Sequence, residues 1–293
     1  MNTRTKGFVA VIVSAAFFGL VPLFVKTICA GGGNTISAAF YRFLLSLPVI
    51  FAYLKIRHIP MKITKKQLVQ VVGITLFGYG GTSVLLFTSY NYIPSGMSTT
   101  LHFMYPVFTI LGCVLFLKEK LRPLKLLCVL LCFGGVVLFY DGESAAGIFG
   151  MMLALVSGIT YAFYTIYLRQ SRLQEMDSLK LIFYLNLVAT VMIGIMAGAG
   201  GNLMIDMTPK AWLVAFVFAS LASFIGVLGF QEGVKYIGPE TTVILSTFEP
   251  ITSVIVGVLV YQESFSFKTL VGCICIFASV IIVAKMKEDQ DPE

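Results

Sequence analysis

Residues 92–119 read YIPSGMSTTLHFMYPVFTILGCVLFLKE, and residues 236–263 read YIGPETTVILSTFEPITSVIVGVLVYQE. The two stretches align without a gap at a constant offset of 144 positions, so that Glu119 falls on Glu263. Each copy is an apolar segment of helix length with a proline and an ionisable side chain inside it. Internal symmetry at half the chain length, in an apolar protein, is typical of transporters built from repeats. The repeat therefore predicts that these two helices line a substrate pathway.

The composition indicates a protein whose surface faces lipid. Of the 293 residues, 58% are hydrophobic and 12% are charged, and the mean hydropathy is +0.91. Soluble proteins carry roughly 25% charged residues, so this chain has too little polar surface to cover a folded body in water. The run from Gly7 to Val25 is long enough to span ~30 Å of hydrocarbon, and we expect it to be a retained helix. We predict a multi-pass protein of a bacterial cytoplasmic membrane.

The chain divides into apolar segments separated by turn residues such as Gly31–Asn34, Asp141-Gly142 and Thr208-Pro209. Most segments have the length that a spanning α-helix needs. We predict an all-α fold with ten transmembrane helices, at residues 7–26, 36–54, 68–90, 96–117, 123–140, 148–168, 179–198, 211–231, 239–261 and 267–284. Residues 288–293 are expected to be a disordered tail.

The positive charges fall mainly at alternate ends of these segments. Of the 21 Lys and Arg residues, 17 lie at one set of ends and three, Lys26, Lys210 and Lys268, lie at the opposite set. Because positively charged loops stay on the cytoplasmic side, both termini are predicted to be cytoplasmic. The net charge of +7 is thereby explained by membrane topology, and no nucleic-acid partner is expected.

An odd number of helices in each half makes the repeat an inverted one. The first helices of the two halves also match, at an offset of 143, with Gly7 on Gly150 and Lys26 on Arg169. Inverted repeats place a binding site at their interface near the bilayer midplane. We predict two repeats, residues 1–140 and 148–287, that rock about such a site.

Several motifs resemble one known family. An Arg early in the second helix (Tyr41-Arg42-Phe43-Leu44), a Glu at the ends of two helices (Leu117-Lys118-Glu119 and Tyr261-Gln262-Glu263) and Glu249-Pro250 are similar to the EamA branch of the drug/metabolite transporters. The resemblance covers nearly the whole chain. It implies a fold of two five-helix repeats and a transport function, and it leaves the substrate open because the family carries amino acids, sugars, nucleosides, amines and drugs.

Polar side chains at spacings of three and four line one face of each repeated helix. The candidates for a substrate cavity are Ser98, His102 and Tyr105 in the fourth helix and Thr242, Ser246 and Glu249 in the ninth. Lipid satisfies no hydrogen bond, so these faces must meet protein or water. The alternative interpretation is interhelical hydrogen bonding that holds the bundle together.

The charged and prolyl positions each have two interpretations. Glu249, near the bilayer centre, is either a proton or cation site that couples to transport or a structural acceptor of hydrogen bonds. Arg42 either neutralises a substrate carboxylate or reaches neighbouring helix ends. His102 either titrates beside the substrate or is hydrogen-bonded in the structure. Pro106 and Pro250 free the carbonyls four residues earlier, either beside a cavity or at a packing kink. Glu263 is expected to be an interface or capping residue, as is Glu119.

Aromatic side chains extend the candidate cavity. Tyr79, Tyr161 and Tyr164 fall on or near the same faces, and a wall of rings suits apolar side chains or organic cations. In a chain with 25 Phe, the alternative is packing or contact with lipid.

Motifs for other functions are missing from the sequence. H-E-x-x-H, G-x-S-x-G and the phosphate-binding loop of ATPases do not occur, and the cysteines form no metal-ligand or disulfide pattern. We therefore predict no enzyme activity, no metal and no cofactor.

The predicted function is secondary active transport of a small polar or zwitterionic metabolite, an amino acid or a relative, with export preferred and possible proton or cation coupling. The alternatives are transport of a choline-like organic cation and a non-transport scaffold or receptor. The protein is expected to be a monomer or a homodimer.

Overall fold

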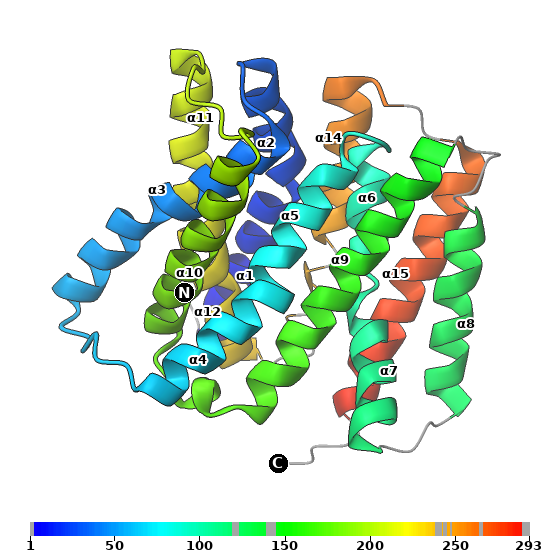
Figure 1. The fold of residues 1–293 in the computed structure, drawn as a ribbon. Helices are drawn as coiled ribbons and strands as arrows, with labels where there is room; N and C mark the ends of the chain where they lie inside the picture. The colour runs from blue at the N-terminus through cyan, green and yellow to red at the C-terminus, as the bar shows by residue number, and fades with distance from the viewer. Residues whose placement is uncertain are drawn as a thin grey trace.

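The computed structural model describes residues 3–118, 123–138, 145–237, 242, 245–246, 248–263 and 266–288, and this part of the chain is helical without any strand (Figure 1). Seven of its helices are long and apolar enough to cross a membrane. Three shorter apolar helices, Leu126–Gly135, Phe248–Tyr261 and Phe267–Ser279, lie at further predicted spans. The all-helical prediction is confirmed. The count of ten spans and their orientation stay predictions, and the expected tail lies mostly outside the described residues.

The first repeat contains α1 (Thr3–Gly19), α2 (Val21–Ala30), α3 (Thr35–Ile56), α4 (Lys65–Ile74), the π-helix η1 (Thr75–Tyr79), α5 (Gly80–Ser89), α6 (Ser95–His102), α7 (Tyr105–Leu117) and α8 (Pro123–Leu138). The second contains α9 (Ala145–Gln170), the short 3-10 helix η2 (Arg172–Glu175), α10 (Ser178–Ala199), α11 (Pro209–Ser220), the π-helix η3 (Leu221–Gly226), α12 (Val227–Ile237), α14 (Phe248–Tyr261) and α15 (Phe267–Glu288).

Local sequence explains where several helices begin. The side chains of Asn34, Thr64, Asp177 and Thr208 accept hydrogen bonds from backbone N–H groups in the first turns of α3, α4, α10 and α11. Such caps satisfy donors that have no partner inside the helix. Gly32, with φ of +97°, allows the chain to reverse between α2 and α3 in a conformation that other residues rarely adopt. The predicted breaks at Gly31–Asn34 and Thr208-Pro209 are confirmed.

Two predicted spans are each interrupted near a proline. The first helix breaks at Leu20, with Pro22 in the first turn of α2. The fourth breaks at Phe103 and Met104, with Pro106 in the first turn of α7. Proline lacks the N–H that a continuous helix needs. The carbonyl of His102 packs against α9, where a Cβ atom on Gly158 would lie 2.9 Å from the carbonyl oxygen. The structure thus favours the packing interpretation of this break.

The third helix of each repeat contains one of the two π-helices, at overlapping positions of the repeat. Each π-helix packs against the first helix of the other repeat, η1 on α9 and η3 on α1. Glycines allow this close approach, because a Cβ on Gly78 would lie 2.9 Å from the Cβ of Tyr164, and one on Gly226 would lie 3.2 Å from Phe18. π-Helices are rare and frequently occur at functional sites.

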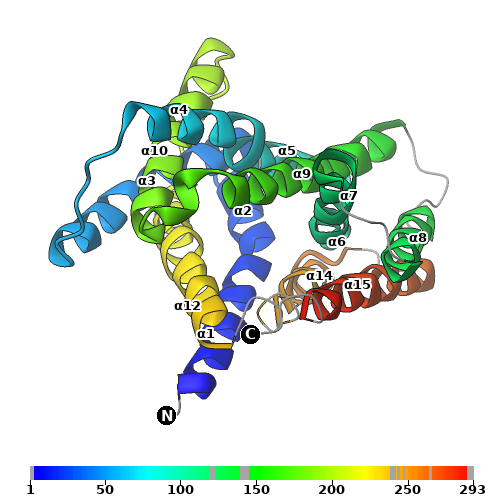
Figure 2. The same ribbon diagram turned by 90° about the horizontal axis from the view of Figure 1, so that it is seen from below.

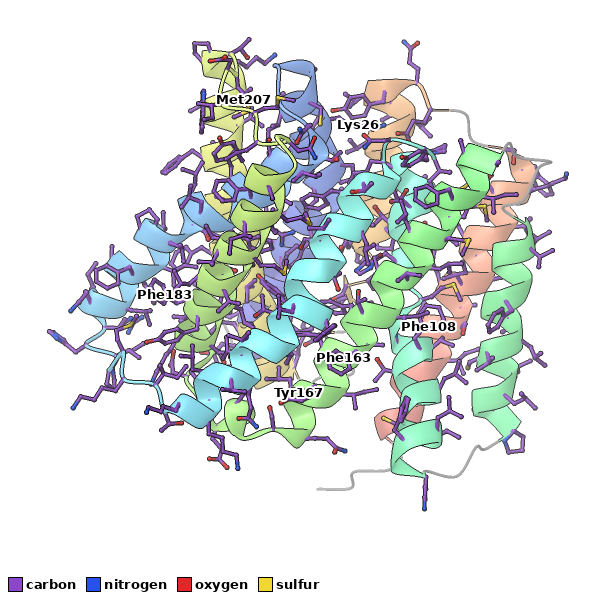
Figure 3. The ribbon with its side chains drawn as sticks, in the orientation of Figure 1. Lys26, Phe108, Phe163, Tyr167, Phe183 and Met207 are labelled. Atoms are coloured by element: carbon purple, nitrogen blue, oxygen red, sulfur yellow. The ribbon has the colours of Figure 1, made fainter. Side chains whose placement is uncertain are left out.

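The two repeats are interleaved. Helix α1 packs along α12, α5 along α9, α3 along α10, and α8 along α15, so each contact joins one repeat to the other (Figure 2). The largest buried cluster has Phe43, Phe87 and Phe218 among its members and also joins both repeats. Lys26 and Met207 lie at one end of the bundle, and Tyr167 lies toward the opposite end (Figure 3).

Candidate functional site

Five predicted site residues form one group, which we call the interior aromatic cluster: Tyr79, His102, Tyr105, Tyr161 and Tyr164. They come from η1, α6, α7 and α9. The ring centroids of Tyr105 and Tyr161 are 4.6 Å apart, those of Tyr161 and Tyr164 are 5.4 Å apart, and those of Tyr164 and Tyr79 are 5.7 Å apart. The His102 ring lies 5.6 Å from Tyr161 and 6.0 Å from Tyr105. The four tyrosines are half-buried.

A hydrogen bond determines which nitrogen of His102 carries a proton. His102 Nδ1 lies 2.9 Å from Ser157 Oγ, and the Ser157 hydroxyl donates to the Ala154 carbonyl at 2.6 Å. Because that hydroxyl has one proton, it accepts from His102, and Nδ1 is the protonated nitrogen of the neutral ring. The Nε2 atom is then a hydrogen-bond acceptor. Ser157 is fully buried, and the sequence analysis did not select it.

Tyr79 is anchored from α10. Its hydroxyl donates to Asn186 Oδ1 at 3.0 Å, and Asn186 Nδ2 donates to Ser46 Oγ at 2.8 Å. Asn186 is fully buried, so both ends of its amide are satisfied inside the bundle. Asn186 is not among the predicted site residues, although a lone amide in the apolar helix Ser178–Ala199 was an available signal.

Arg42 is buried beside the aromatic cluster. Its guanidinium lies 5.4 Å from the ring centroid of Phe43, 5.7 Å from that of Phe87 and 5.4 Å from that of Phe218. Arg42 Nε donates to the hydroxyl of Ser223 in η3 at 3.4 Å. The side chain is 9% exposed, so it stays within the protein and does not extend to the membrane surface. Its charge is stabilised by ring faces and one hydroxyl.

Glu249 is the second residue of α14 and is half-buried. Its carboxylate and the Arg42 guanidinium are close enough for their charges to interact, and the hydroxyls of Tyr105 and Tyr161 are within the same range. Within the described ranges, neither a hydrogen bond nor a contact ion pair reaches this carboxylate. A carboxylate that lacks direct partners in a low-dielectric interior is energetically costly. Whether Glu249 binds a proton or a cationic group stays a prediction.

The hydroxyls on the two polar faces differ in how they are satisfied. Ser246 donates to the carbonyl of Thr242 at 2.9 Å, and both residues are buried. The fully buried hydroxyl of Ser98 has no hydrogen-bond partner in the part of the chain that is described. Across the described residues, no hydrogen bond or ring contact connects Ser98 or Ser246 with the aromatic cluster.

Glu263 lies apart from this cluster, at the end of the bundle that holds Lys26. It accepts hydrogen bonds from the backbone N–H of Ser95 at 3.0 Å and from the Ser95 hydroxyl at 2.8 Å. The expectation that Glu263 is a capping residue is confirmed. Glu119, its counterpart in the first repeat, lies outside the described residues.

Metal-binding side chains do not gather anywhere in the described ranges: no three His, Cys, Asp or Glu side chains are placed to share an ion. The described side chains in and around the interior aromatic cluster instead supply the guanidinium of Arg42, the carboxylate of Glu249, the imidazole of His102 and four phenol rings. Charge, hydrogen bonds and ring contacts are the interactions that such a set offers to a small organic molecule.

Proteins with a similar sequence are named as uncharacterized transporters. An uncharacterized transporter of Archaeoglobus fulgidus is 25% identical over 285 residues, which cover 94% of this chain and 95% of the relative. The uncharacterized transporter YcbK of Bacillus subtilis is 24% identical over 285 residues, with 93% and 91% covered. These names point to a transporter and not to an enzyme.

The fold and both repeats match known examples. A protein of known crystal structure superposes with a TM-score of 0.67 at 15% identity, over 98% of both chains, and so has the same fold. The model of the EamA-like transporter family matches residues 5–141 and again residues 148–285. Together with its apolar helices, this double match makes the protein a multi-pass membrane protein, consistent with a bacterial inner membrane. The chain belongs to the EamA-like transporter family.

Proposed function

We propose that the protein is a secondary transporter of a small zwitterionic metabolite, an amino acid or a close relative. The observation that carries this proposal is the placement of Arg42 and Glu249. Their opposite charges are near enough to interact but form no contact ion pair, and the interior aromatic cluster lies beside them. A zwitterion carries one negative group, which matches Arg42, and one positive group, which matches Glu249.

The available donors and acceptors support this assignment. Ser223 accepts from the Nε of Arg42, and no described residue hydrogen-bonds to the two terminal nitrogens, so these keep donors for a substrate carboxylate. The Glu249 carboxylate and the tyrosine ring faces suit an ammonium group. His102 Nε2 adds an acceptor for a substrate N–H. This set is specific for charge and tolerant of side-chain shape.

Alternating access is the proposed mechanism, with ten spans, both termini cytoplasmic and export as the preferred direction. Because α1 packs along α12 and α5 along α9, we propose that each moving body combines helices of both repeats, and that residues 1–140 and 148–287 do not separate as two blocks. Protonation of Glu249 would couple movement to a gradient, since a neutral side chain crosses between states at lower electrostatic cost.

A second candidate is transport of an organic cation of the choline type. It is favoured by the environment of Arg42, whose charge already faces three phenyl rings and a hydroxyl. Glu249 would then be the counter-charge for the ligand, with Tyr105 and Tyr161 as ring contacts. The residues that bind would overlap with those of the first candidate, but Arg42 would contribute little.

A thermal-shift screen of the purified protein separates these candidates. The ligands are amino acids, choline-like amines, polyamines, nucleosides and sugars. A ligand at about 100 times its Kd stabilises the folded state by ~2.7 kcal/mol, which raises Tm by several degrees. We expect amino acids to stabilise the wild type and Glu175→Gln, an exposed control, and to lose this effect in Glu249→Gln and Arg42→Met.

The two variants give different results for the two candidates. Stabilisation by amines alone that survives Arg42→Met would favour the cation transporter. Flux of the stabilising ligand into proteoliposomes tests transport itself, and binding without any flux would support the scaffold or receptor alternative.

A further inference from the structure

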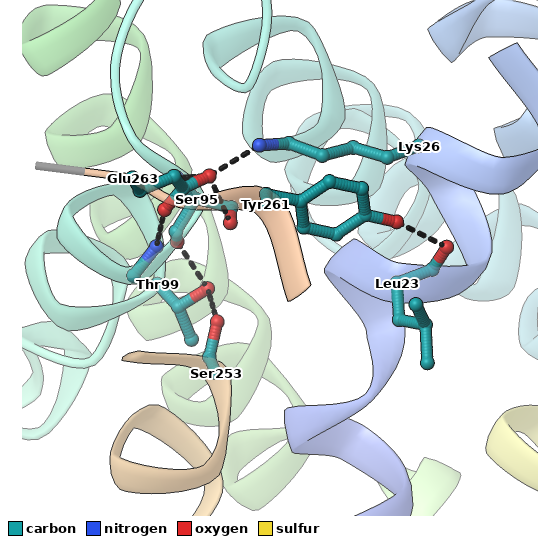
Figure 4. Close-up of polar contacts among 8 residues, drawn as sticks. Leu23, Lys26, Ser95, Thr99, Ser253, Tyr261 and Glu263 are labelled. Atoms are coloured by element: carbon teal, nitrogen blue, oxygen red, sulfur yellow. Dashed lines mark hydrogen bonds and ion pairs between the residues drawn. The ribbon is translucent and has the colours of Figure 1, made fainter. Parts of the chain in front are cut away.

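One carboxylate connects three helices at the end of the bundle that holds Lys26 (Figure 4). Glu263, just after α14, accepts from the Ser95 backbone N–H at 3.0 Å and from the Ser95 hydroxyl at 2.8 Å, and it pairs with the Lys26 ammonium. Lys26 belongs to α2, and Ser95 is the first residue of α6. Since α6 lies in the first copy of the repeated stretch and α14 in the second, Glu263 ties the repeats together at this end.

Helix α6 depends on this carboxylate for its cap. The residue before it, Pro94, offers no side-chain hydrogen bond to the helix start. The first N–H groups of a helix have no partner within it and carry partial positive charge. Glu263 supplies the missing acceptor to Ser95 and also approaches the N–H of Gly96 at 3.5 Å. The end of one repeated segment therefore caps the start of the other.

The contact lies at the end of the bundle and is partly exposed. The side chain of Lys26 is 24% exposed and that of Glu263 is 11% exposed. A deeply buried ion pair would cost several kcal/mol to open, whereas hydration replaces part of the interaction in a partly exposed pair. Tyr261 keeps Lys26 in place. The Lys26 ammonium lies 4.5 Å from the centroid of the Tyr261 ring, and the Tyr261 hydroxyl donates to the Leu23 carbonyl at 3.1 Å.

Deeper in the bundle, α6 and α14 touch through small and neutral groups. Ser253 donates to the Thr99 hydroxyl at 3.0 Å, and both residues are buried. A Cβ on Gly96 would lie 2.9 Å from the Cα of Val254, so the two backbones approach closely. Neutral hydrogen bonds contribute ~1 kcal/mol, about half as much as charge-assisted ones. The charged contact at the rim is thus the strongest polar tie between these helices.

We propose that Lys26, Ser95 and Glu263 form a latch, which closes this end of the transporter in the present conformation and releases when α6 and α14 separate to open it. The latch rests on the proposed transport function. With cytoplasmic termini it lies at the outer end, and its release gives the outward-open state.

The reactivity of a cysteine at position 253 tests the latch in the full chain. Ser253 is fully buried between α6 and α14, so a thiol reagent reaches Ser253→Cys only when the two helices part. Mass spectrometry of the peptide with position 253 leaves the native cysteines in place. We expect Glu263→Gln to raise the labelling rate about tenfold or more, because it removes charge-assisted hydrogen bonds. Lys26→Met should raise it less, since Ser95 still binds Glu263.

The matched control is Glu175→Gln, the same chemical change at an exposed site in η2. Labelling within about twofold of the wild type is expected for it. If Glu263→Gln labels no faster than Glu175→Gln, while both variants melt in a cooperative transition, the latch proposal is wrong. This measurement needs no substrate, so it separates a failed latch from a failed transport proposal.

A cross-link provides a second test that does not depend on removing Glu263. The hydroxyls of Thr99 and Ser253 are 3.0 Å apart, so cysteines at both positions are placed to form a disulfide. Oxidation should lower substrate flux about tenfold or more, and a reductant should restore it. Full flux through the oxidised double variant, with the cross-link verified by mass spectrometry, would show that this end does not need to open.

Discussion

Two glutamates near the opposite ends of one helix, Glu249 and Glu263, have very different surroundings. Glu263 binds Lys26 and both the backbone and the hydroxyl of Ser95. Glu249 has no direct polar partner in the described part of the chain, although Arg42 lies within electrostatic range. A carboxylate whose partners come from the protein stabilises one conformation. A buried carboxylate without such partners binds a ligand or a proton more readily, because binding offsets the free-energy cost of its desolvation.

The interior aromatic cluster contains the same contrast among its tyrosines. The Tyr79 hydroxyl has a dedicated acceptor in Asn186, whereas no described hydrogen bond involves the hydroxyl of Tyr161. We infer that Tyr79 is mainly an anchor of the cluster and that Tyr161 is available to the ligand.

The largest effect is expected for Glu249→Gln, which removes the available carboxylate. Gradient-driven transport should fall about a hundredfold, because an unpaired buried charge in the ligand or in Arg42 costs ~3–5 kcal/mol. Exchange of substrate across the membrane is expected to persist at substrate concentrations above the weakened Kd, since exchange needs no net proton movement. Flux into proteoliposomes with and without a proton gradient measures both. Pumping at the wild-type rate would contradict the coupling role of Glu249.

A smaller effect, on stability, is expected for Glu263→Gln. The neutral amide loses the ion pair with Lys26 and weakens the cap of α6, at a cost of ~1–3 kcal/mol. Tm should fall by about 2–8 °C in differential scanning fluorimetry. Ligand affinity, measured in the same samples, should stay within about threefold of the wild type. A large loss of affinity without a change in Tm would reverse the roles of the two glutamates.

Tyr79→Phe and Tyr161→Phe should separate the two kinds of tyrosine. Tyr79→Phe leaves the buried Oδ1 of Asn186 without its donor and should destabilise the protein by ~1–2 kcal/mol, with little change in affinity. Tyr161→Phe should leave Tm within about 2 °C and weaken ligand binding several-fold. Titration of ligand during thermal melting measures both quantities. Equal effects of the two variants would remove the distinction.

The smallest effect is expected for the pH dependence of the latch. Burial acts to raise the pKa of Glu263, but hydrogen bonds from Lys26 and Ser95 outweigh it and hold that pKa below its ordinary value of 4.5. The stabilisation is therefore complete above pH 4.5 and is lost as the pH falls through the lowered pKa. The Tm difference between wild type and Glu263→Gln should be constant from about pH 7 to 5.5 and shrink below about pH 4. A difference that grows on acidification would contradict this sign.

Much of the fold follows from local sequence. Residues close in sequence set the apolar segments of spanning length and the glycine and proline turns between them. Helices are present at these segments in the described part of the chain. The grouping of Tyr105 with Tyr161 and Tyr164 agrees with the predicted polar and aromatic faces, because helical periodicity sets which side chains share a face. Their role in binding stays a prediction.

Tertiary structure alone decided which partners these side chains have. Ser157 beside His102, Asn186 beside Tyr79 and Ser223 beside Arg42 join residues between 55 and 181 positions apart, and each pair crosses from one repeat to the other. Hydropathy and spacing describe one helix at a time, so they contain no information about which helices pack together. The sequence by itself determined an apolar, twice-repeated helical chain with charges at known depths. The packing of the repeats decided that Glu263 is satisfied and Glu249 is not, because only the folded bundle brings Lys26 and Ser95 to one carboxylate and leaves the other with Arg42 within electrostatic range but not in contact.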